Sequence, residues 1–175
     1  MSVRLGRLRP RDRSRVAELL VSTAVFSRDE IDVALQLFDA TVAGEGATGA
    51  DDAHVPDYEF TGAFDGERLL GYACAGPTPA TEGTFDLYWL AVDATAQGKG
   101  IGTTLVRAVE RELRDRGARM LLVETSSRPD YSNTRAFYAR CGYREAARIK
   151  DFYAPADDRI MLTTRLTPER GAATQ

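Results

Sequence analysis

A glycine-rich segment constrains this chain more than any other feature of its sequence. Gly98, Gly100 and Gly102 stand between an apolar run at 84–92 and a segment at 101–113 with an apolar residue at every fourth position. The run predicts a strand and the repeat predicts an amphipathic helix. Because glycine lacks Cβ, the turn can direct its backbone N–H groups inward, and the first helical turn adds unpaired donors and a partial positive charge. The segment therefore predicts a cradle for a pyrophosphate group.

Two other phosphate-binding patterns fit this segment less well. A P-loop needs wider glycine spacing followed by Lys and Ser or Thr, and the chain lacks that pattern. A dinucleotide fingerprint matches at Gly98, Gly100 and position 103, and Glu124 follows about twenty residues later. However, Thr103 stands where the third glycine belongs, and the glycines come too late in the chain for a doubly wound sheet. We therefore exclude both patterns.

Hydrophobic periodicity predicts an alternation of strands and helices along the chain. The expected strands cover 2–9, 58–64, 68–75, 84–92, 119–125, 143–153 and 158–166, and the expected helices cover 12–22, 28–43, 101–116 and 130–141. This order predicts an α/β fold with a mixed sheet and helices on its faces. We also expect a loop at 44–56 and a disordered tail at 167–175.

Local signals mark several boundaries of these elements. Ser27 and Glu30 have the spacing of a capping box at the start of the second helix. The pair Asp65-Gly66 between two apolar runs predicts a hairpin turn. On the third helix, Glu110 and Arg114 stand four residues apart, which predicts an ion pair on a solvated helix face.

The composition excludes several classes of site. The chain has 175 residues with two cysteines and one histidine, and Cys74, Cys141 and His54 show no metal-ligand spacing. We therefore expect reduced thiols, no metal and no Ser-His triad. The lack of a signal-like or membrane-length apolar run predicts a cytoplasmic protein with no membrane partner.

Two segments resemble the motifs of one enzyme family. The segment Leu90–Gly102 is similar to the acetyl-CoA motif of the GCN5-related N-acetyltransferase (GNAT) family, Gln/Arg-x-x-Gly-x-Gly/Ala. The segment Phe137–Tyr143 resembles the family motif Phe-Tyr-x-x-x-Gly-Phe. The resemblance covers 58–166 by motif and 1–57 by element order. It implies a single domain over 1–166, with a mixed, mostly antiparallel central sheet and helices on both faces.

The resemblance implies acetyl-CoA as a cosubstrate. The glycine loop would bind its pyrophosphate, and the backbone at Leu90–Val92 would pair with its pantetheine arm like an added strand. The positions implied in cofactor binding are Leu90, Ala91, Val92, Gln97, Gly98, Lys99, Gly100, Ile101, Gly102 and Thr103.

The resemblance also implies that Tyr138 protonates or hydrogen-bonds the leaving thiolate. Tyr131, Thr134 and Tyr138 share one helical stripe, so we expect Tyr138 to face the cleft while Phe137 and Cys141 pack inward. With reference pKa values of about 10 for tyrosine and 8.5 for a thiol, full proton transfer is uphill by roughly 2 kcal/mol. A hydrogen bond to the developing thiolate is therefore the better description.

Two carboxylates are candidates for the general base. Asp86 stands eleven residues before Gln97, where the histone-modifying branch of the family places a catalytic glutamate. Because Asp86 and Leu90 share one face of the expected strand, this carboxylate could point into the same cleft. Glu124, at the end of the next strand, is the second candidate. An acid that only neutralises an incoming ammonium remains the alternative role for Asp86.

The charge is distributed in blocks that point to the nature of the acceptor. Residues 1–28 carry a balance of +5, residues 29–96 carry −13 and residues 97–175 carry +5, for a net charge of −3. The implied fold places the acidic block near the acceptor entrance, so we expect a cationic amine. The acidic net charge and the lack of aromatic residues among the arginines of the third helix exclude nucleic acid.

Two functions remain open at this point. The first is an N-acetyltransferase that passes the acetyl group of acetyl-CoA to a primary amine, small or protein-borne, by direct attack in a ternary complex. The second is a non-catalytic acyl-CoA sensor of the same fold. The predicted hairpin that contains Tyr153 and Asp157-Asp158 would line the acceptor site or form a contact in a homodimer.

Overall fold

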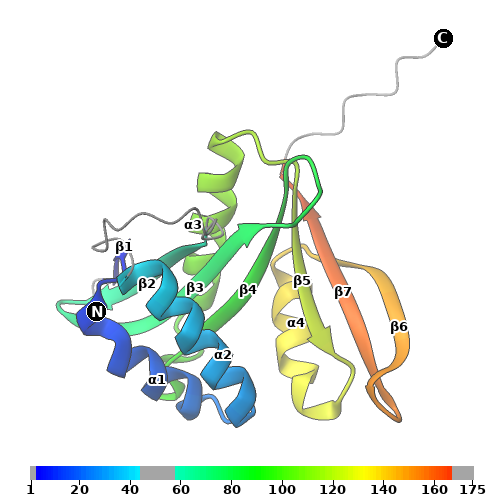
Figure 1. The fold of residues 1–175 in the computed structure, drawn as a ribbon, viewed down its shortest axis with the longest axis horizontal. Helices are drawn as coiled ribbons and strands as arrows, with labels where there is room; N and C mark the ends of the chain where they lie inside the picture. Colours follow the sequence, from blue (N-terminus) through cyan, green and yellow to red (C-terminus); the bar gives the residue numbers. More distant parts are fainter. Residues whose placement is uncertain (1–2, 44–57, 167–175) are drawn as a thin grey trace. The chain divides into compact units, whose positions relative to one another are not determined.

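The described part of the chain holds seven strands and four α-helices in the predicted order (Figure 1). The computed structural model describes residues 3–43 and 58–166. The strands are β1 (Val3–Arg7), β2 (Glu59–Asp65), β3 (Arg68–Pro77), β4 (Thr84–Val92), β5 (Met120–Ser126), β6 (Arg144–Ala154) and β7 (Asp157–Arg165). The helices are α1 (Arg13–Ser22), α2 (Arg28–Phe38), α3 (Ile101–Asp115) and α4 (Ser132–Arg140), with short helical turns η1 (Pro10–Asp12), η2 (Asp39–Ala43), η4 (Ala94–Ala96) and η5 (Pro129–Tyr131).

The strands form one sheet in the order β1-β2-β3-β4-β5-β7-β6. Strands β4 and β5 run parallel, with Asp86 opposite Leu122, while β1/β2, β2/β3, β5/β7 and β6/β7 are antiparallel. Thr78 N donates to Thr84 O at 2.9 Å and Asp93 N donates to Leu70 O at 2.8 Å, as expected at the two ends of an antiparallel β3/β4 ladder. The predicted mixed, mostly antiparallel sheet is therefore confirmed.

The chain divides into two compact units, each described here by itself. The N-terminal unit comprises residues up to Pro77 together with Leu87–Val109, and the C-terminal unit comprises Thr78–Asp86 together with the residues from Glu110 onward. Two elements cross this division: β4 and α3 each contribute residues to both units. The predicted loop at 44–56 and tail at 167–175 lie outside the described residues.

The core of the N-terminal unit packs α1 and α2 against strands β2 to β4. Helix α1 buries Val16, Leu19 and Leu20, which share one helical face, and α2 buries Ala34 and Phe38. The Phe38 and Phe60 rings meet edge to face at 5.4 Å, and Phe60 stacks on Tyr72 at 6.1 Å. In Figure 1, α1 and α2 lie on the front of these strands.

The predicted capping box at the start of α2 is confirmed. Ser27 Oγ accepts a hydrogen bond from Glu30 N at 3.3 Å, and Glu30 Oε2 accepts one from Ser27 N at 2.8 Å. The helix predicted over 28–43 continues past Phe38, but its last turn, η2, is a π-helix. The predicted hairpin at Asp65-Gly66 is also confirmed, since Asp65 pairs with Arg68 and Gly66 has φ +59°.

In the C-terminal unit, β5 lies between β4 and β7, and β6 is the edge strand. Leu121, Leu122 and Val123 of β5 are buried, whereas every residue of β6 is exposed. The β6–β7 hairpin confirms the predicted pairing of 143–153 with 158–166. Exposed Phe152 and Tyr153 lie on β6, where a homodimer contact or acceptor site remains a prediction.

Three further findings concern the described residues, 3–43 and 58–166. Cys74 and Cys141 are free and buried, as predicted. None of the helices there is long and apolar enough to cross a membrane. No group of three or more metal-ligating side chains is found in the same residues.

Candidate functional site

The glycine-rich loop leads from the end of β4 to the start of α3 in the N-terminal unit. After η4, Gly98 and Gly100 adopt φ +73° and +79°, a conformation that favours glycine. A Cβ built on either residue meets no atom within 4 Å, so the space above both glycines is open. Ile101, which begins α3, is buried and anchors the helix beneath the loop. The residues are therefore arranged as the predicted cradle requires.

Backbone donors line the end of α3 next to this loop. Thr104 N donates to Gly100 O at 2.9 Å, which is the first hydrogen bond of the helix. The N–H groups of residues 101–103 precede that bond and have no partner within the helix. Together with the dipole of the helix they favour an anion at this point.

The polar side chains of the loop stabilise it from within. Gln97 Nε2 donates to Val92 O at 3.2 Å, and Lys99 Nζ donates to Thr95 O at 2.9 Å. The Lys99 ammonium has two more N–H donors, so it can also attract a phosphate. Gln97 and Lys99, which the sequence predicts to bind the cofactor, thus also stabilise the loop by hydrogen bonds to its backbone.

Asp93 fixes the beginning of the loop, and the sequence analysis missed it. Its Oδ1 accepts hydrogen bonds from Thr95 N at 2.8 Å and Thr95 Oγ1 at 2.7 Å, and its Oδ2 forms ion pairs with Arg15 and, at 3.1 Å, with Arg68. The hydrogen bonds from Thr95, followed by those from Arg15, hold the pKa of Asp93 well below its usual value of 3.8. An Asp two residues before a Thr at the end of a strand is typical of an Asx turn, and could have pointed to this role.

Gly71 on β3 is a second residue that the sequence analysis missed. A Cβ at this position would lie 2.7 Å from Ala91 O and 3.2 Å from Val92 Cα. Only glycine therefore lets β3 approach the stretch Leu90–Val92 this closely. An isolated glycine inside a predicted strand is a known sign of such an approach.

The three candidate catalytic side chains all belong to the C-terminal unit. Asp86, on the first part of β4, is half-buried, and its Oδ2 accepts a hydrogen bond from Thr78 Oγ1 at 2.6 Å. The hydroxyl of Thr78 thus orients this carboxylate. Glu124 on β5 is more exposed and is ion-paired with Arg159 of the neighbouring strand β7.

Tyr138 packs differently from the prediction. It is 4% exposed and is the buried residue of α4, whereas Phe137 is only half-buried. Its ring meets those of Phe137 and Tyr143 edge to face at 5.1 and 5.3 Å. Cys141 is buried as expected. Burial, with a smaller contribution from Cys141, raises the pKa of the Tyr138 hydroxyl above its usual 10, so this group stays protonated.

The prediction that Glu110 lies on a solvated helix face is wrong. Glu110 is 3% exposed. Burial of Tyr143 is the main reason why the pKa of Tyr143 is raised, and the charge of Glu110 is the next. Arg114 Nε donates to Leu166 O at 2.8 Å. Long-range packing of the end of α3 therefore overrides the local charge pattern.

Comparison with known proteins identifies the family. The sequence model described as "Acetyltransferase (GNAT) family" matches residues 17–143. The chain belongs to the GNAT family. A solved GNAT-family structure from Desulfovibrio desulfuricans is 37% identical to it, with a TM-score of 0.84 over 95% of this chain and 100% of the other. The predicted GNAT fold is thereby confirmed. Among curated proteins, none matches the chain in sequence.

Two less similar solved structures show a likeness in fold. The PaiA N-acetyltransferase from Thermoplasma acidophilum, in complex with coenzyme A, is 16% identical, with a TM-score of 0.68 over 94% of this chain and 99% of its own. The aminoglycoside 6'-N-acetyltransferase from Enterococcus faecium is 17% identical, with a TM-score of 0.69 over 94% of this chain and 98% of its own.

The residues of the loop fit the acyl-CoA that GNAT proteins use. The open space above Gly98 and Gly100 suits a pyrophosphate, as do the N–H groups at the start of α3, which have no partner within the helix. Gln97, Lys99 and Asp93 hold the loop in that shape.

We expect Gly100→Ala to weaken coenzyme A binding by about five- to thirtyfold. Alanine at this positive φ is strained by about 1–2 kcal/mol, so the loop relaxes and binding must restore its shape. Gly66→Ala is the matched control, because Gly66 also has positive φ and open space around its Cβ position. Calorimetry should show weakened binding in the first variant only, while both lose similar stability. Equal affinity in the two variants would contradict the cradle.

Proposed function

We propose that this GNAT protein is an acetyl-CoA-dependent N-acetyltransferase that acts on a cationic primary amine. Family membership supports the reaction class. The single observation that carries the proposal is the glycine loop at the start of α3, with open space above Gly98 and Gly100 and positive φ at both. When bound, acetyl-CoA supplies an acetyl group activated as a thioester.

The N-terminal unit supplies the proposed cosubstrate site. The backbone N–H groups of residues 98–103 bind the pyrophosphate, and Lys99 adds electrostatic attraction. The backbone of Leu90–Val92 pairs with the pantetheine arm and helps to polarise the acetyl carbonyl. Gly71 supports this role, because it brings β3 into close contact with Ala91 and Val92.

The C-terminal unit supplies the proposed proton chemistry. The ammonium group loses one proton before its nitrogen attacks, and formation of the C–N bond releases a second. Asp86 accepts a proton directly or through a water molecule, and the other proton passes to solvent. The hydrogen bond from Thr78 supports this assignment, because it holds the carboxylate in one orientation. Glu124 is the alternative base, although its carboxylate is already engaged by Arg159.

Tyr138 stabilises the sulfur when the C–S bond breaks. Because burial raises the pKa of Tyr138, complete proton transfer to the thiolate is even less favourable than for an ordinary tyrosine. We therefore assign Tyr138 a hydrogen bond to the developing thiolate. Its edge-to-face contacts with Phe137 and Tyr143 support this role by restricting the ring.

The charge of the chain supports a cationic acceptor. Residues 29–96 carry a balance of −13, and Glu59 and Asp86 are described members of that block. Asp39 and Asp93 are paired with arginines and contribute less to its field. The predicted members Asp51, Asp52 and Asp57 lie outside the described residues. Such a surface raises the local concentration of an ammonium substrate.

The proposal is tested by free-thiol release from acetyl-CoA with a panel of cationic, neutral and acidic amines. We expect turnover with a cationic amine. In Tyr138→Phe, loss of one hydrogen bond to a charged sulfur lowers kcat by about 10- to 100-fold. Coenzyme A affinity should not change.

Two outcomes would replace the proposal. Thermal stabilisation by coenzyme A without turnover on any amine would favour the acyl-CoA sensor. A lack of stabilisation by coenzyme A would contradict both functions.

A further inference from the structure

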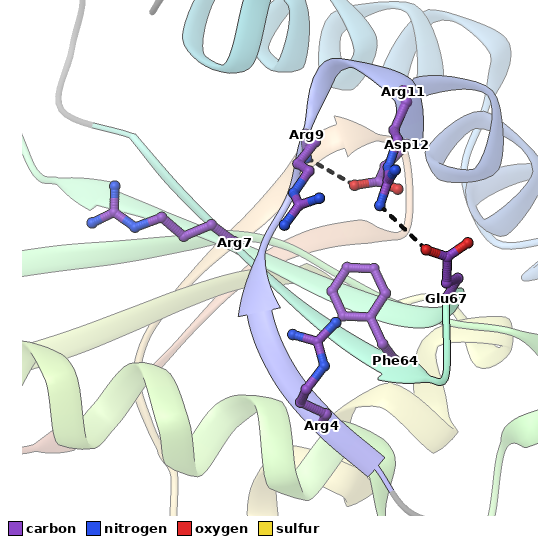
Figure 2. Close-up of a pocket in the computed structure, with 7 residues that line it drawn as sticks. All are labelled: Arg4, Arg7, Arg9, Arg11, Asp12, Phe64 and Glu67. Atoms are coloured by element: carbon purple, nitrogen blue, oxygen red, sulfur yellow. Dashed lines mark hydrogen bonds and ion pairs between the residues drawn. The ribbon is translucent and has the colours of Figure 1, made fainter.

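A second basic site lies at the sheet edge formed by β1, in the N-terminal unit. Four arginines, Arg4, Arg7, Arg9 and Arg11, line a hollow of about 260 Å³ beside Phe64 (Figure 2). None of these residues belongs to the glycine loop or to the candidate catalytic set. They supply more than half of the basic residues in the +5 block at 1–28, which the proposed function does not use.

Two of the guanidinium groups, those of Arg4 and Arg9, lie beside one aromatic ring. Phe64 is 5% exposed, and the Arg4 guanidinium lies 5.2 Å from the centre of its ring. In Figure 2, Arg4 and Arg9 point toward this ring from opposite sides, whereas Arg7 points away. The cation–π contact holds the Arg4 fork on the edge of the hollow.

The two acidic residues of the hollow leave it with a positive charge. Asp12 Oδ2 accepts a hydrogen bond from Arg9 N at 2.8 Å, where it caps the turn η1. Glu67 is 93% exposed in its side chain and lies 3.8 Å from Arg11. An ion pair this long and this exposed is weak. Without Arg7, three guanidinium groups, those of Arg4, Arg9 and Arg11, still outnumber the two carboxylates, one of which serves the backbone.

Protection of an edge strand does not explain this arrangement. Charged residues on an exposed edge prevent pairing with other strands, but scattered lysines or single arginines suffice for that. Here the arginines come from both β1 and the turn after it, and they surround one hollow. Convergent guanidinium groups are typical of oxyanion recognition, because each fork can bind two oxygens at once.

From this geometry we infer that the hollow formed by Arg4, Arg7, Arg9 and Arg11 binds a diphosphate group. Its volume is below the roughly 300–1,000 Å³ of pockets for drug-sized ligands, so the bound part is compact. Because several guanidinium groups line this small hollow, it favours a compact group with several negative charges. The source is either free pyrophosphate or the diphosphate of a nucleotide.

Calorimetric titration with inorganic pyrophosphate tests this site when the glycine loop is first saturated with coenzyme A. We expect a Kd below about 1 mM at 150 mM salt, where diffuse surface attraction is screened. In the double variant Arg9→Gln/Arg11→Gln the affinity should fall at least about tenfold, since two charge-assisted contacts are lost. The control is Arg13→Gln/Arg28→Gln, which removes the same charge from the same block but leaves the hollow and the glycine loop intact.

Comparison of the two double variants distinguishes binding in the hollow from general attraction to positive charge. Equal weakening in the two double variants, or no binding to the unmodified protein, would overturn the inference. Unchanged coenzyme A binding and unchanged Tm in Arg9→Gln/Arg11→Gln would show that the variant is folded and that the glycine loop is unaffected. Titration with ADP identifies the source: tighter binding than pyrophosphate indicates a nucleotide, and equal or weaker binding indicates the free anion.

Discussion

Asp86→Asn is expected to lower kcat by about 10²- to 10⁴-fold, the range of a positioned general base. The substitution keeps the size of the side chain and its oxygen toward Thr78, but it removes the group that accepts the proton from the amine. Coenzyme A binding should not change, because the substitution keeps the size of the side chain and alters no residue of the glycine loop. Initial rates of thiol release at saturating amine, together with calorimetry for coenzyme A, provide both measurements.

Two further isosteric variants make this prediction specific. Asp115→Asn removes an exposed carboxylate from the end of α3 and should leave kcat unchanged. Glu124→Gln should have a much smaller effect than Asp86→Asn, because Arg159 already engages Glu124. If Glu124→Gln gives the large decrease and Asp86→Asn does not, the base is Glu124. If neither does, a water chain without a carboxylate base is the better mechanism.

Most of the fold was predictable because its signals are local. The capping box at Ser27 and Glu30, the turn at Asp65-Gly66 and the strand Thr84–Val92 each depend on residues within one element or one turn. Hydrophobic alternation then decides which face of each element is buried. The glycine loop was also predictable, since its shape follows from glycine and from the start of the helix.

The structure differs from the predictions where segments that are far apart in the sequence pack against each other. Glu110 is buried near Tyr143, and Arg114 donates to Leu166, which follows β7 in the sequence. Helical spacing identifies which residues share a stripe, but it does not say what each stripe packs against. For the same reason, Phe137 was expected to pack inward, yet it is half-buried and Tyr138 is the buried residue of α4.

Asp93 illustrates a residue whose importance depends on partners far away in the sequence. Arg15 lies on α1 and Arg68 begins β3, so no local pattern connects them with the end of β4. Its short-range contacts with Thr95 carry a recognisable spacing, but only the long-range ion pairs make it a buried anchor of the loop.

Asp93→Ala is therefore expected to destabilise the protein by about 3–4 kcal/mol. About 3 kcal/mol comes from a broken buried ion pair that leaves Arg15 without this partner, and about 1 kcal/mol from the lost cap on Thr95. For a chain of this length the Tm should fall by roughly 6–16 °C. Asp93→Asn keeps the cap and should recover about 1 kcal/mol of the loss. Denaturant titration of both variants measures the difference.

Asp39→Ala provides the matched control. Asp39 also makes two contacts with one arginine, at 2.6 and 2.8 Å to Arg13, but both side chains are more than two-fifths exposed. That exposed pair should contribute no more than about 1 kcal/mol. A loss in Asp39→Ala as large as that in Asp93→Ala would show that burial is not what makes Asp93 important.

The pH dependence of stability gives an independent test of Asp93. Its folded-state pKa lies below the unfolded value of 3.8, so its charge stabilises the fold fully above about pH 5. As the pH falls below 4 toward the folded pKa, protonation removes this contribution. The difference in free energy of unfolding between the unmodified protein and Asp93→Asn should thus be constant near neutral pH and shrink below pH 4. A difference that stays constant down to pH 2 would mean that the carboxylate is not held as an anion by Thr95 and Arg15.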